Sequence, residues 1–247
     1  MVMDGREDRL RMGARLVRSL RLLKRLFYER VYVNPKHKKD VVAAFHKMYY
    51  DFGFLGKTWC DSRWLGYPTL KCPLDLWIFQ ELLFKLKPDV VIECGTFRGG
   101  SALFLASVCE MMHRGRVISI DIQSRDGLPT HPRVTYVCGS SVSEEVLRQV
   151  RMGIAPGDKV LVILDSDHRK QHVLNELRAY SPLVSVGSYL IVEDTNVNGH
   201  PVESGHGPGP FEAAQEFLSE HSDFVIDRDI EAHLLSFNPQ GYLRKIR

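Results

Sequence analysis

Polar residues follow five short apolar segments of the sequence, and they are of types that bind cofactors and metal ions. The segments cover residues 90–92, 117–120, 134–137, 160–164 and 189–192, and the residues at or just after their ends are Glu93, Asp121, Ser140 with Ser141, Asp165, and Glu193 with Asp194. A single acidic residue after a strand often only caps the next helix. In an open sheet, however, ligands bind outside the carboxyl ends of parallel strands. Because all five segments end this way, we expect these side chains to converge on one edge of a sheet.

Segments of helical pattern alternate with the five apolar ones and must hold them in place. We predict helices at residues 74–86, 101–112, 142–152, 170–180 and 210–220. Pro73 suits the first turn of the first helix, and Lys87-Pro88 ends it, since proline cannot continue a helix. Strands that are apolar throughout are typical of a parallel sheet buried on both faces. The fold class is therefore α/β, with a doubly wound, mostly parallel sheet that residues 223–228 and 234–246 close as a strand pair.

The turn after the first strand, Gly95–Ser101, is rich in glycine, which lets a ligand approach the backbone closely. Its spacing, G-x-x-x-G-G, differs from the G-x-G-x-x-G of dinucleotide-binding proteins, and it has no P-loop lysine. These differences argue against a nicotinamide-dependent dehydrogenase. The E-x-G start at Glu93 instead suits a nucleoside that carries a sulfonium and an amino-acid tail. Asp121, at the end of the second strand, is placed to accept hydrogen bonds from both hydroxyls of a ribose.

Three carboxylates, Asp165, Glu193 and Asp194, follow two strands that we expect to be neighbours. Carboxylates crowded together repel one another, so that one is protonated or a cation binds. Oxygen ligands of this kind select Mg²⁺ or Ca²⁺. The alternative is that Glu193 and Asp194 only cap the next segment and face solvent. His168, which follows Asp165 closely, could take up a proton near neutral pH, although a lone loop histidine is often incidental.

Longer motifs resemble the cephalosporin hydroxylase/rhamnosyl O-methyltransferase family from about residue 50 to the C-terminus. They are Thr58-Trp59, Trp64-Leu65-Gly66-Tyr67-Pro68, Lys71, Pro73-x-Asp75-Leu76-Trp77, Leu86-Lys87-Pro88-Asp89, Val91-Ile92-Glu93-x-Gly95-Thr96-x-x-Gly99-Gly100-Ser101, Asp165-Ser166-Asp167-His168, Tyr180-Ser181-Pro182-Leu183-Val184, Val192-Glu193-Asp194-Thr195, Val197-Asn198-Gly199-His200-Pro201-Val202 and Gly207-Pro208-Gly209-Pro210-x-Glu212-Ala213. The resemblance implies an S-adenosylmethionine-dependent, Mg²⁺-assisted O-methyltransferase. It also implies the seven-stranded, Rossmann-like sheet of class I methyltransferases, whose last strand runs antiparallel.

The same resemblance implies roles for the residues at the strand ends. Glu93, Gly95 and Ser101 would hold the methionine part of the cofactor, Asp121 the ribose, and Ser140 and Ser141 the adenine, while Asp165, Glu193 and Asp194 would bind the metal, with Asp165 also beside the cofactor. In catechol-type methyltransferases a lysine base lies three positions after the metal-binding aspartate, whereas here that residue is His168. His200 and His206 are the rival candidates for the base. They lie in the loop His200–Pro210, whose length suits a lid.

The acceptor implied by the resemblance is a sugar. Mg²⁺ would bind two neighbouring oxygens of the acceptor. A vicinal diol, such as that of a rhamnosyl or mannosyl glycan, satisfies this requirement. Residues 50–72 and the lid loop are expected to form the walls of its pocket. The alternatives are a non-sugar natural product as acceptor, or a non-catalytic nucleoside-binding protein. A hydroxylase, which one family name suggests, would need iron ligands such as two histidines and a carboxylate, whereas the three expected ligands offer only oxygen.

The chain of 247 residues is long enough for one large domain, and its charge is unevenly distributed. Residues 1–40 hold twelve Lys and Arg against five Asp and Glu, whereas the net charge of +3 is too balanced for a nucleic-acid-binding protein. We divide the chain into a basic helical extension, 1–50, and a methyltransferase domain, 51–247. Residues 6–30 have the pattern of a basic amphipathic helix, which could contact a membrane surface, the domain or a second subunit. A linker at 34–39, a short helix at 40–50 and a homo-oligomer are also expected.

The remaining composition bears on the compartment. The five cysteines are odd in number and form no C-x-x-C, which indicates neither a disulfide framework nor a zinc ribbon. No apolar stretch approaches the ~20 residues that span a bilayer. Arginines interrupt the first thirty residues every few positions, unlike a signal peptide. We therefore expect a cytoplasmic protein.

Overall fold

The computed structural model describes residues 20, 22–24, 26 and 35–247. The chain divides into two units, Met1–Phe45 and His46–Arg247, and each is considered by itself. The amphipathic helix predicted at 6–30 lies almost entirely outside the described residues. Within the described part, no helix is both long and apolar enough to cross a membrane.

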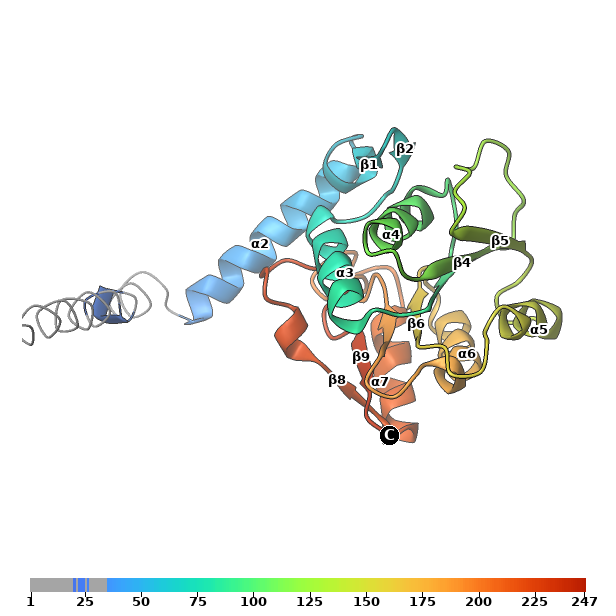
Figure 1. Cartoon of the computed structure of the whole chain (residues 1–247). Helices are drawn as coiled ribbons and strands as arrows, with labels where there is room; N and C mark the ends of the chain where they lie inside the picture. The colour runs from blue at the N-terminus through green and yellow to red at the C-terminus, as the bar shows by residue number, and fades with distance from the viewer. Residues whose placement is uncertain (1–19, 21, 25, 27–34) are drawn as a thin grey trace, which may run out of the picture. The chain divides into compact units, whose positions relative to one another are not determined.

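A seven-stranded sheet forms the centre of the unit His46–Arg247 (Figure 1). Its strands are β3 (Val90–Cys94), β4 (Arg116–Asp121), β5 (Val134–Cys138), β6 (Val160–Leu164), β7 (Tyr189–Val192), β8 (Phe224–Ile226) and β9 (Tyr242–Lys245), in the order β5-β4-β3-β6-β7-β9-β8. The five strands predicted from apolar segments pair in parallel. The predicted doubly wound α/β fold is confirmed.

Helices cover both faces of this sheet because successive strand residues point to opposite sides. The helices are α3 (Pro73–Leu86), α4 (Gly100–Met111), α5 (Glu144–Met152), α6 (Lys170–Tyr180) and α7 (Pro210–Glu220), all within two residues of the predicted bounds. Val91 packs with α3 and α4 in one core, whereas Val90 and Ile92 pack with α5, α6 and α7 in the other. All three side chains are fully buried.

The predicted closing pair is present, but β9 is shorter than residues 234–246. It is antiparallel to both of its neighbours, β7 and β8. Gly241, just before β9, allows this insertion, since a Cβ there would lie 2.2 Å from the carbonyl oxygen of Val192. A side chain at this position would therefore force β9 away from β7.

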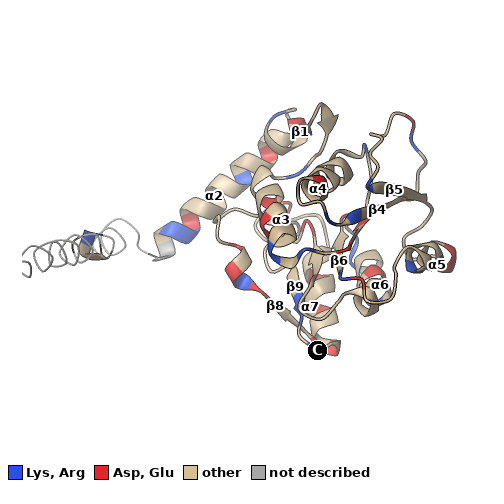
Figure 2. Ribbon diagram, viewed as in Figure 1, with Lys and Arg blue, Asp and Glu red and all other residues tan. Residues whose placement is uncertain are grey.

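Two predictions for the segment before the sheet were wrong or incomplete. The expected linker at 34–39 is helical from Pro35 onward, because α2 (Pro35–Gly53) begins there and includes the short helix expected at 40–50. Proline fits the first helical position, where no backbone N–H is needed. Figure 2 shows the basic residues at the start of α2 in blue. A 3₁₀ turn, η1 (Thr58–Asp61), and a hairpin of β1 (Arg63–Trp64) and β2 (Tyr67–Pro68) follow α2 and were not predicted.

All five cysteines are free in the structure, and Cys60 and Cys138 are exposed.

Candidate active site

Two adjoining cavities lie at the carboxyl ends of the parallel strands. The larger has a volume of about 680 Å³ and the smaller about 320 Å³. Residues that line both are Gly95, Phe97, Asp165, Ser166, His168 and His206. The shared wall means that groups bound in the two cavities would meet beside Asp165 and His168.

The larger cavity is lined by most of the residues predicted to bind the cofactor, namely Gly95, Asp121, Ser140, Ser141 and Asp165. Gly95 has φ +107°, and a Cβ there would lie 1.8 Å from the carbonyl oxygen of Asp165, so only glycine fits. Asp121 accepts hydrogen bonds from the backbone N–H groups of Phe97, at 2.8 Å, and Gln123, at 2.9 Å. These bonds fix its carboxylate at the cavity wall.

Two further residues predicted to hold the cofactor lie elsewhere. Glu93 is fully buried and lines neither cavity. Its Oε2 accepts a hydrogen bond of 2.6 Å from the Ser119 hydroxyl, and burial raises its pKa. Ser101 lines only the smaller cavity. In the structure, Glu93 therefore lies beneath the turn Gly95–Ser101, here called the cofactor loop, and not on the cavity surface.

A network behind the larger cavity was not recognised in the sequence. Glu176, fully buried on α6, accepts hydrogen bonds through Oε1 from the hydroxyls of Ser141, at 2.5 Å, and Ser166, at 2.7 Å. His172 places Nε2 3.3 Å from the same oxygen and also lines the cavity. One buried carboxylate thus orients three polar groups of the cavity wall. The only sequence signal was the i, i+4 spacing of His172 and Glu176.

Asp165, His168 and Asp194 converge where the cavities meet. Each offers one ligand atom, and these atoms lie within 4.8 Å of one another, the one such group of three among the described residues. His168 Nδ1 is 3.3 Å from Asp194 Oδ2. Asp194 has φ +53°, an uncommon conformation that its backbone N–H stabilises by donating to Asn238 Oδ1 at 3.0 Å.

The electrostatics of this cluster favour a bound cation. Burial, followed by the nearby charge of Asp165, raises the pKa of Asp194 to about 6. Burial opposes the charged form of His168, but Asp194 and Asp165 outweigh it and raise the pKa of the imidazole. Burial is the larger cause for Asp194, whereas the shift of His168 reports the negative charge of both carboxylates, which a dication would neutralise.

Glu193, the third predicted metal ligand, contacts a lysine instead of joining this group. Because Leu164 of β6 pairs with Val192 of β7, Asp165 and Glu193 emerge side by side. Lys71 Nζ lies between them, 2.5 Å from Asp165 Oδ2 and 2.7 Å from Glu193 Oε1. Burial opposes its charge, but Asp165 and Glu193 outweigh this effect and raise the pKa of Lys71. The sequence motif contained Lys71, but no spacing linked it to these carboxylates.

The loop before α7 separates the two rival histidines. His200 stacks on Phe211 with ring centroids 3.8 Å apart, and its Nε2 lies 3.0 Å from Glu212 Oε1. It lines neither cavity, whereas His206 lines both. Glu212 also accepts hydrogen bonds from the backbone N–H of Gly209, at 2.7 Å, and from Asn198 Nδ2, at 2.8 Å. Its carboxylate therefore fastens both ends of the loop to α7.

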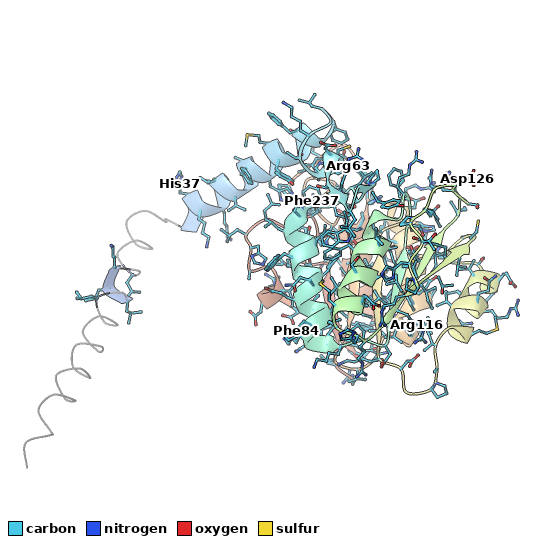
Figure 3. All side chains as sticks on the ribbon, turned by 45° about the horizontal axis from the view of Figure 1, so that its top comes forward. His37, Arg63, Phe84, Arg116, Asp126 and Phe237 are labelled. Carbon is cyan, nitrogen blue, oxygen red and sulfur yellow. The ribbon has the colours of Figure 1, made fainter. Side chains whose placement is uncertain are left out.

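The lining of the smaller cavity includes residues from before the sheet and from this loop. Tyr50, Trp59, Pro68, Thr69 and Leu70 come from before the sheet, and Glu203 and His206 belong to the loop. Trp59 Nε1 donates to the carbonyl oxygen of Tyr50 at 2.9 Å. Phe237 (Figure 3) packs against both rings, with centroids 5.4 and 6.0 Å away. The aromatic cluster makes this wall rigid.

The seven-stranded sheet with antiparallel β9, and the cavities at its carboxyl edge, define a class I methyltransferase fold. The sequence profile of the family described as Rhamnosyl O-methyltransferase/CmcI matches residues 56–246. The chain belongs to this family, and it is an O-methyltransferase.

Named relatives agree with this assignment. The rhamnosyl O-methyltransferase of Mycobacterium leprae is 40% identical over 188 residues, which cover 73% of this chain and 79% of the relative. That of Mycobacterium bovis is 37% identical over 213 residues, covering 83% and 85%. A solved structure of CmcI without ligand has a TM-score of 0.59 at 22% identity and covers 75% of this chain and 76% of its own, which supports the fold.

Proposed function

We propose that this O-methyltransferase transfers a methyl group from S-adenosylmethionine to a hydroxyl of a sugar with a vicinal diol, with the help of Mg²⁺. The observation that carries the proposal is the wall shared by the two cavities, where Asp165 and His168 face both. A donor in the larger cavity and an acceptor in the smaller would have their reacting groups side by side. Alignment of this kind can recover ~7–11 kcal/mol of the barrier.

The larger cavity suits the donor nucleoside. Asp121 offers carboxylate oxygens that can accept from ribose hydroxyls, and Ser140 and Ser141 offer hydroxyls to the adenine. Gly95 lets the methionine end approach the backbone, with Ser101 nearby. A solved structure of CmcI with Mg and SAM, which has a TM-score of 0.58 to this chain at 22% identity, supports this choice. Glu93, buried below, would support the loop through Ser119.

Asp165 and Asp194, whose carboxylate oxygens already converge, would hold the metal together with Glu193. Three carboxylates fit the preference of Mg²⁺ for oxygen ligands. When bound, Mg²⁺ would acidify and orient the acceptor hydroxyl. Two relatives named rhamnosyl O-methyltransferase support a sugar as that acceptor.

His168 would act as the general base. Its imidazole lines both cavities, and Nδ1 faces Asp194, whose carboxylate orients the ring and stabilises the imidazolium once the proton has transferred. The acceptor hydroxyl would lose its proton to His168, and its oxygen would attack the methyl carbon of the sulfonium. The carbon–sulfur bond would break, with its electron pair left on sulfur, so that the neutral thioether S-adenosylhomocysteine departs. His206 remains the rival, since it also lines both cavities, whereas His200 is engaged by Glu212.

The test is turnover with labelled S-adenosylmethionine, Mg²⁺ and a panel of glycans, with and without a chelator. We expect label on a rhamnosyl or mannosyl glycan and its loss when the metal is removed. Transfer that persists in chelator refutes the metal, and transfer only to non-sugar acceptors refutes the sugar. Binding of the donor without any transfer would favour a nucleoside-binding protein.

The division at residue 50, the cytoplasmic location, a homo-oligomer and the contact of residues 6–30 with a membrane or subunit stay predictions. Vesicle sedimentation of the full chain and of a chain without residues 1–30 tests the membrane contact. Equal pelleting of both proteins would refute it.

A further inference from the structure

Lys71 is a buried cation that the chemistry proposed above does not use. Its side chain is 3% exposed, and its Nζ hydrogen-bonds to Asp165 Oδ2 and Glu193 Oε1. A buried ammonium is costly unless its partners are well placed, and a carboxylate left without its cation is equally costly. The position of Lys71 therefore affects the stability of the whole carboxylate cluster.

The segment that carries Lys71 is fixed on both sides. Before it, the backbone N–H of Thr69 donates to the carbonyl oxygen of Ser62 at 2.9 Å. After it, buried Asp75 accepts hydrogen bonds from the Ser236 hydroxyl, at 2.6 Å, and from the Phe237 backbone N–H, at 2.8 Å. Gly100 of α4 allows close packing, since a Cβ there would lie 2.2 Å from the carbonyl oxygen of Pro68. The segment Thr69–Asp75, here called the strap, thus holds Lys71 next to the carboxylates.

The charges at the site are unequal. Besides its two hydrogen-bonded partners, Lys71 interacts electrostatically with three more carboxylates, those of Glu93, Asp194 and Asp75. One ammonium can keep this cluster together but does not neutralise it. Asp165 is shared, because it pairs with Lys71 and also belongs to the group that converges with His168 and Asp194. A dication held by that group would lie close to the ammonium and be repelled by it.

We propose that Lys71 is the resident counter-cation of the carboxylate cluster: it positions Asp165 and Glu193 before a metal ion binds, and it weakens the binding of that ion. The second half of this inference rests on the proposed metal site, whereas the first half does not. Lys71 acts through the two carboxylates and is a positioning residue, not a catalytic one.

The first test measures thermal unfolding in the presence of a chelator. It compares wild type with three variants: Lys71→Met, Lys71→Met combined with Glu193→Gln, and the control Lys245→Met. Lys245 donates to the carbonyl oxygen of Ser181 at 3.0 Å, and its strand position is at the opposite edge of the sheet. We expect Lys71→Met to lower Tm by roughly 5–15 °C, because it leaves buried carboxylates unpaired. Glu193→Gln should restore most of that loss by removing one of them. An unchanged Tm in Lys71→Met, or an equal loss in the single and double variants, would overturn the positioning role.

The second test is calorimetric titration of Mg²⁺ into wild type and Lys71→Met. We expect the variant to bind Mg²⁺ about tenfold more tightly or better, because one opposing charge has gone. Added Mg²⁺ should also raise the Tm of the variant more than that of wild type. Equal or weaker binding by the variant overturns the opposing role. If neither protein binds Mg²⁺, both the opposing role of Lys71 and the proposed metal site are overturned. The unfolding test in the presence of a chelator still decides the positioning role.

Discussion

The Tyr50 hydroxyl donates a hydrogen bond to Glu203 Oε1 at 3.0 Å, although 153 residues separate the two in the sequence. The bond joins α2 to the loop before α7, and both residues line the smaller cavity. One hydrogen bond therefore links the aromatic wall of the proposed acceptor pocket to its lid.

We expect Tyr50→Phe to raise the KM for the acceptor about tenfold, since a hydrogen bond to a charged group contributes roughly 1.5–3 kcal/mol. The kcat and the affinity for S-adenosylmethionine should change little, because Tyr50 does not line the larger cavity. Steady-state kinetics measure this. The control is Tyr189→Phe, which removes the 2.6 Å bond to Asp227 away from the site. An unchanged KM in Tyr50→Phe would show that the link does not shape the pocket.

Asp194→Asn should reduce turnover by about 10²–10³-fold, because a metal ion contributes several kcal/mol to the stabilisation of developing charge. Affinity for S-adenosylmethionine should stay within about tenfold, since Asp194 lines only the smaller cavity. Calorimetry with Mg²⁺ and with the cofactor separates the two effects. Asp126→Asn, in an exposed loop (Figure 3), is the matched control. Loss of cofactor binding in Asp194→Asn would place this carboxylate in the donor site instead.

His168→Gln should slow methyl transfer by about 10²–10⁴-fold, the usual contribution of a general base. Single-turnover rates at saturating acceptor measure the chemical step, and calorimetry checks that Mg²⁺ still binds. His206→Gln serves as the comparison, because His206 lines the same two cavities. A near-normal rate in His168→Gln with a slow His206→Gln would move the base to His206.

Glu212→Gln should loosen the loop before α7 in a pH-dependent way. Partial burial raises the pKa of Glu212, but the hydrogen bonds from Gly209, His200 and Asn198 outweigh it and lower the pKa from 4.5 to about 2. A lowered carboxyl pKa stabilises the folded protein above the unfolded value and loses this effect as pH falls through the folded value. The variant should therefore melt roughly 2–6 °C below wild type at pH 7, and the difference should vanish as pH falls from 4.5 towards 2.

Glu144→Gln, at a side chain that is 89% exposed, is the control for this titration and should melt like wild type throughout. A Tm difference between Glu212→Gln and wild type that persists at pH 2 would contradict the role assigned to the carboxylate.

Local pattern was sufficient for most of the fold. The strands β6 and β7 begin and end where their apolar runs do, because each must be buried on both faces. Pro73, the first residue of α3, and the Lys87-Pro88 pair after the helix fixed its ends within a residue. Pattern failed before the sheet, where α2 begins in a stretch whose lysines and proline resembled a linker.

Part of the candidate site was also visible in the sequence. Asp165, Glu193 and Asp194 follow strands, and pairing of Leu164 with Val192 puts Asp165 and Glu193 side by side. Glu193, however, contacts Lys71, and the group of three ligand atoms contains His168 in its place. His168 was favoured as the base because it lies three positions after Asp165. The sequence did not exclude His200 and His206. The hydrogen bonds of Glu212 do so for His200, since they hold it outside both cavities.

The sequence by itself determined the alternating strands and helices, the edge of the sheet where polar residues gather, and the family. These properties depend on the periodicity of apolar residues, on the positions where strands end and on short motifs. All of these are local features of the sequence. Only the tertiary structure decided that Lys71 bridges Asp165 and Glu193, 94 and 122 residues away, and that Glu93 is buried below the cofactor loop. Ion pairs across such separations depend on how the strap folds over the sheet, and no periodicity along the chain records that approach.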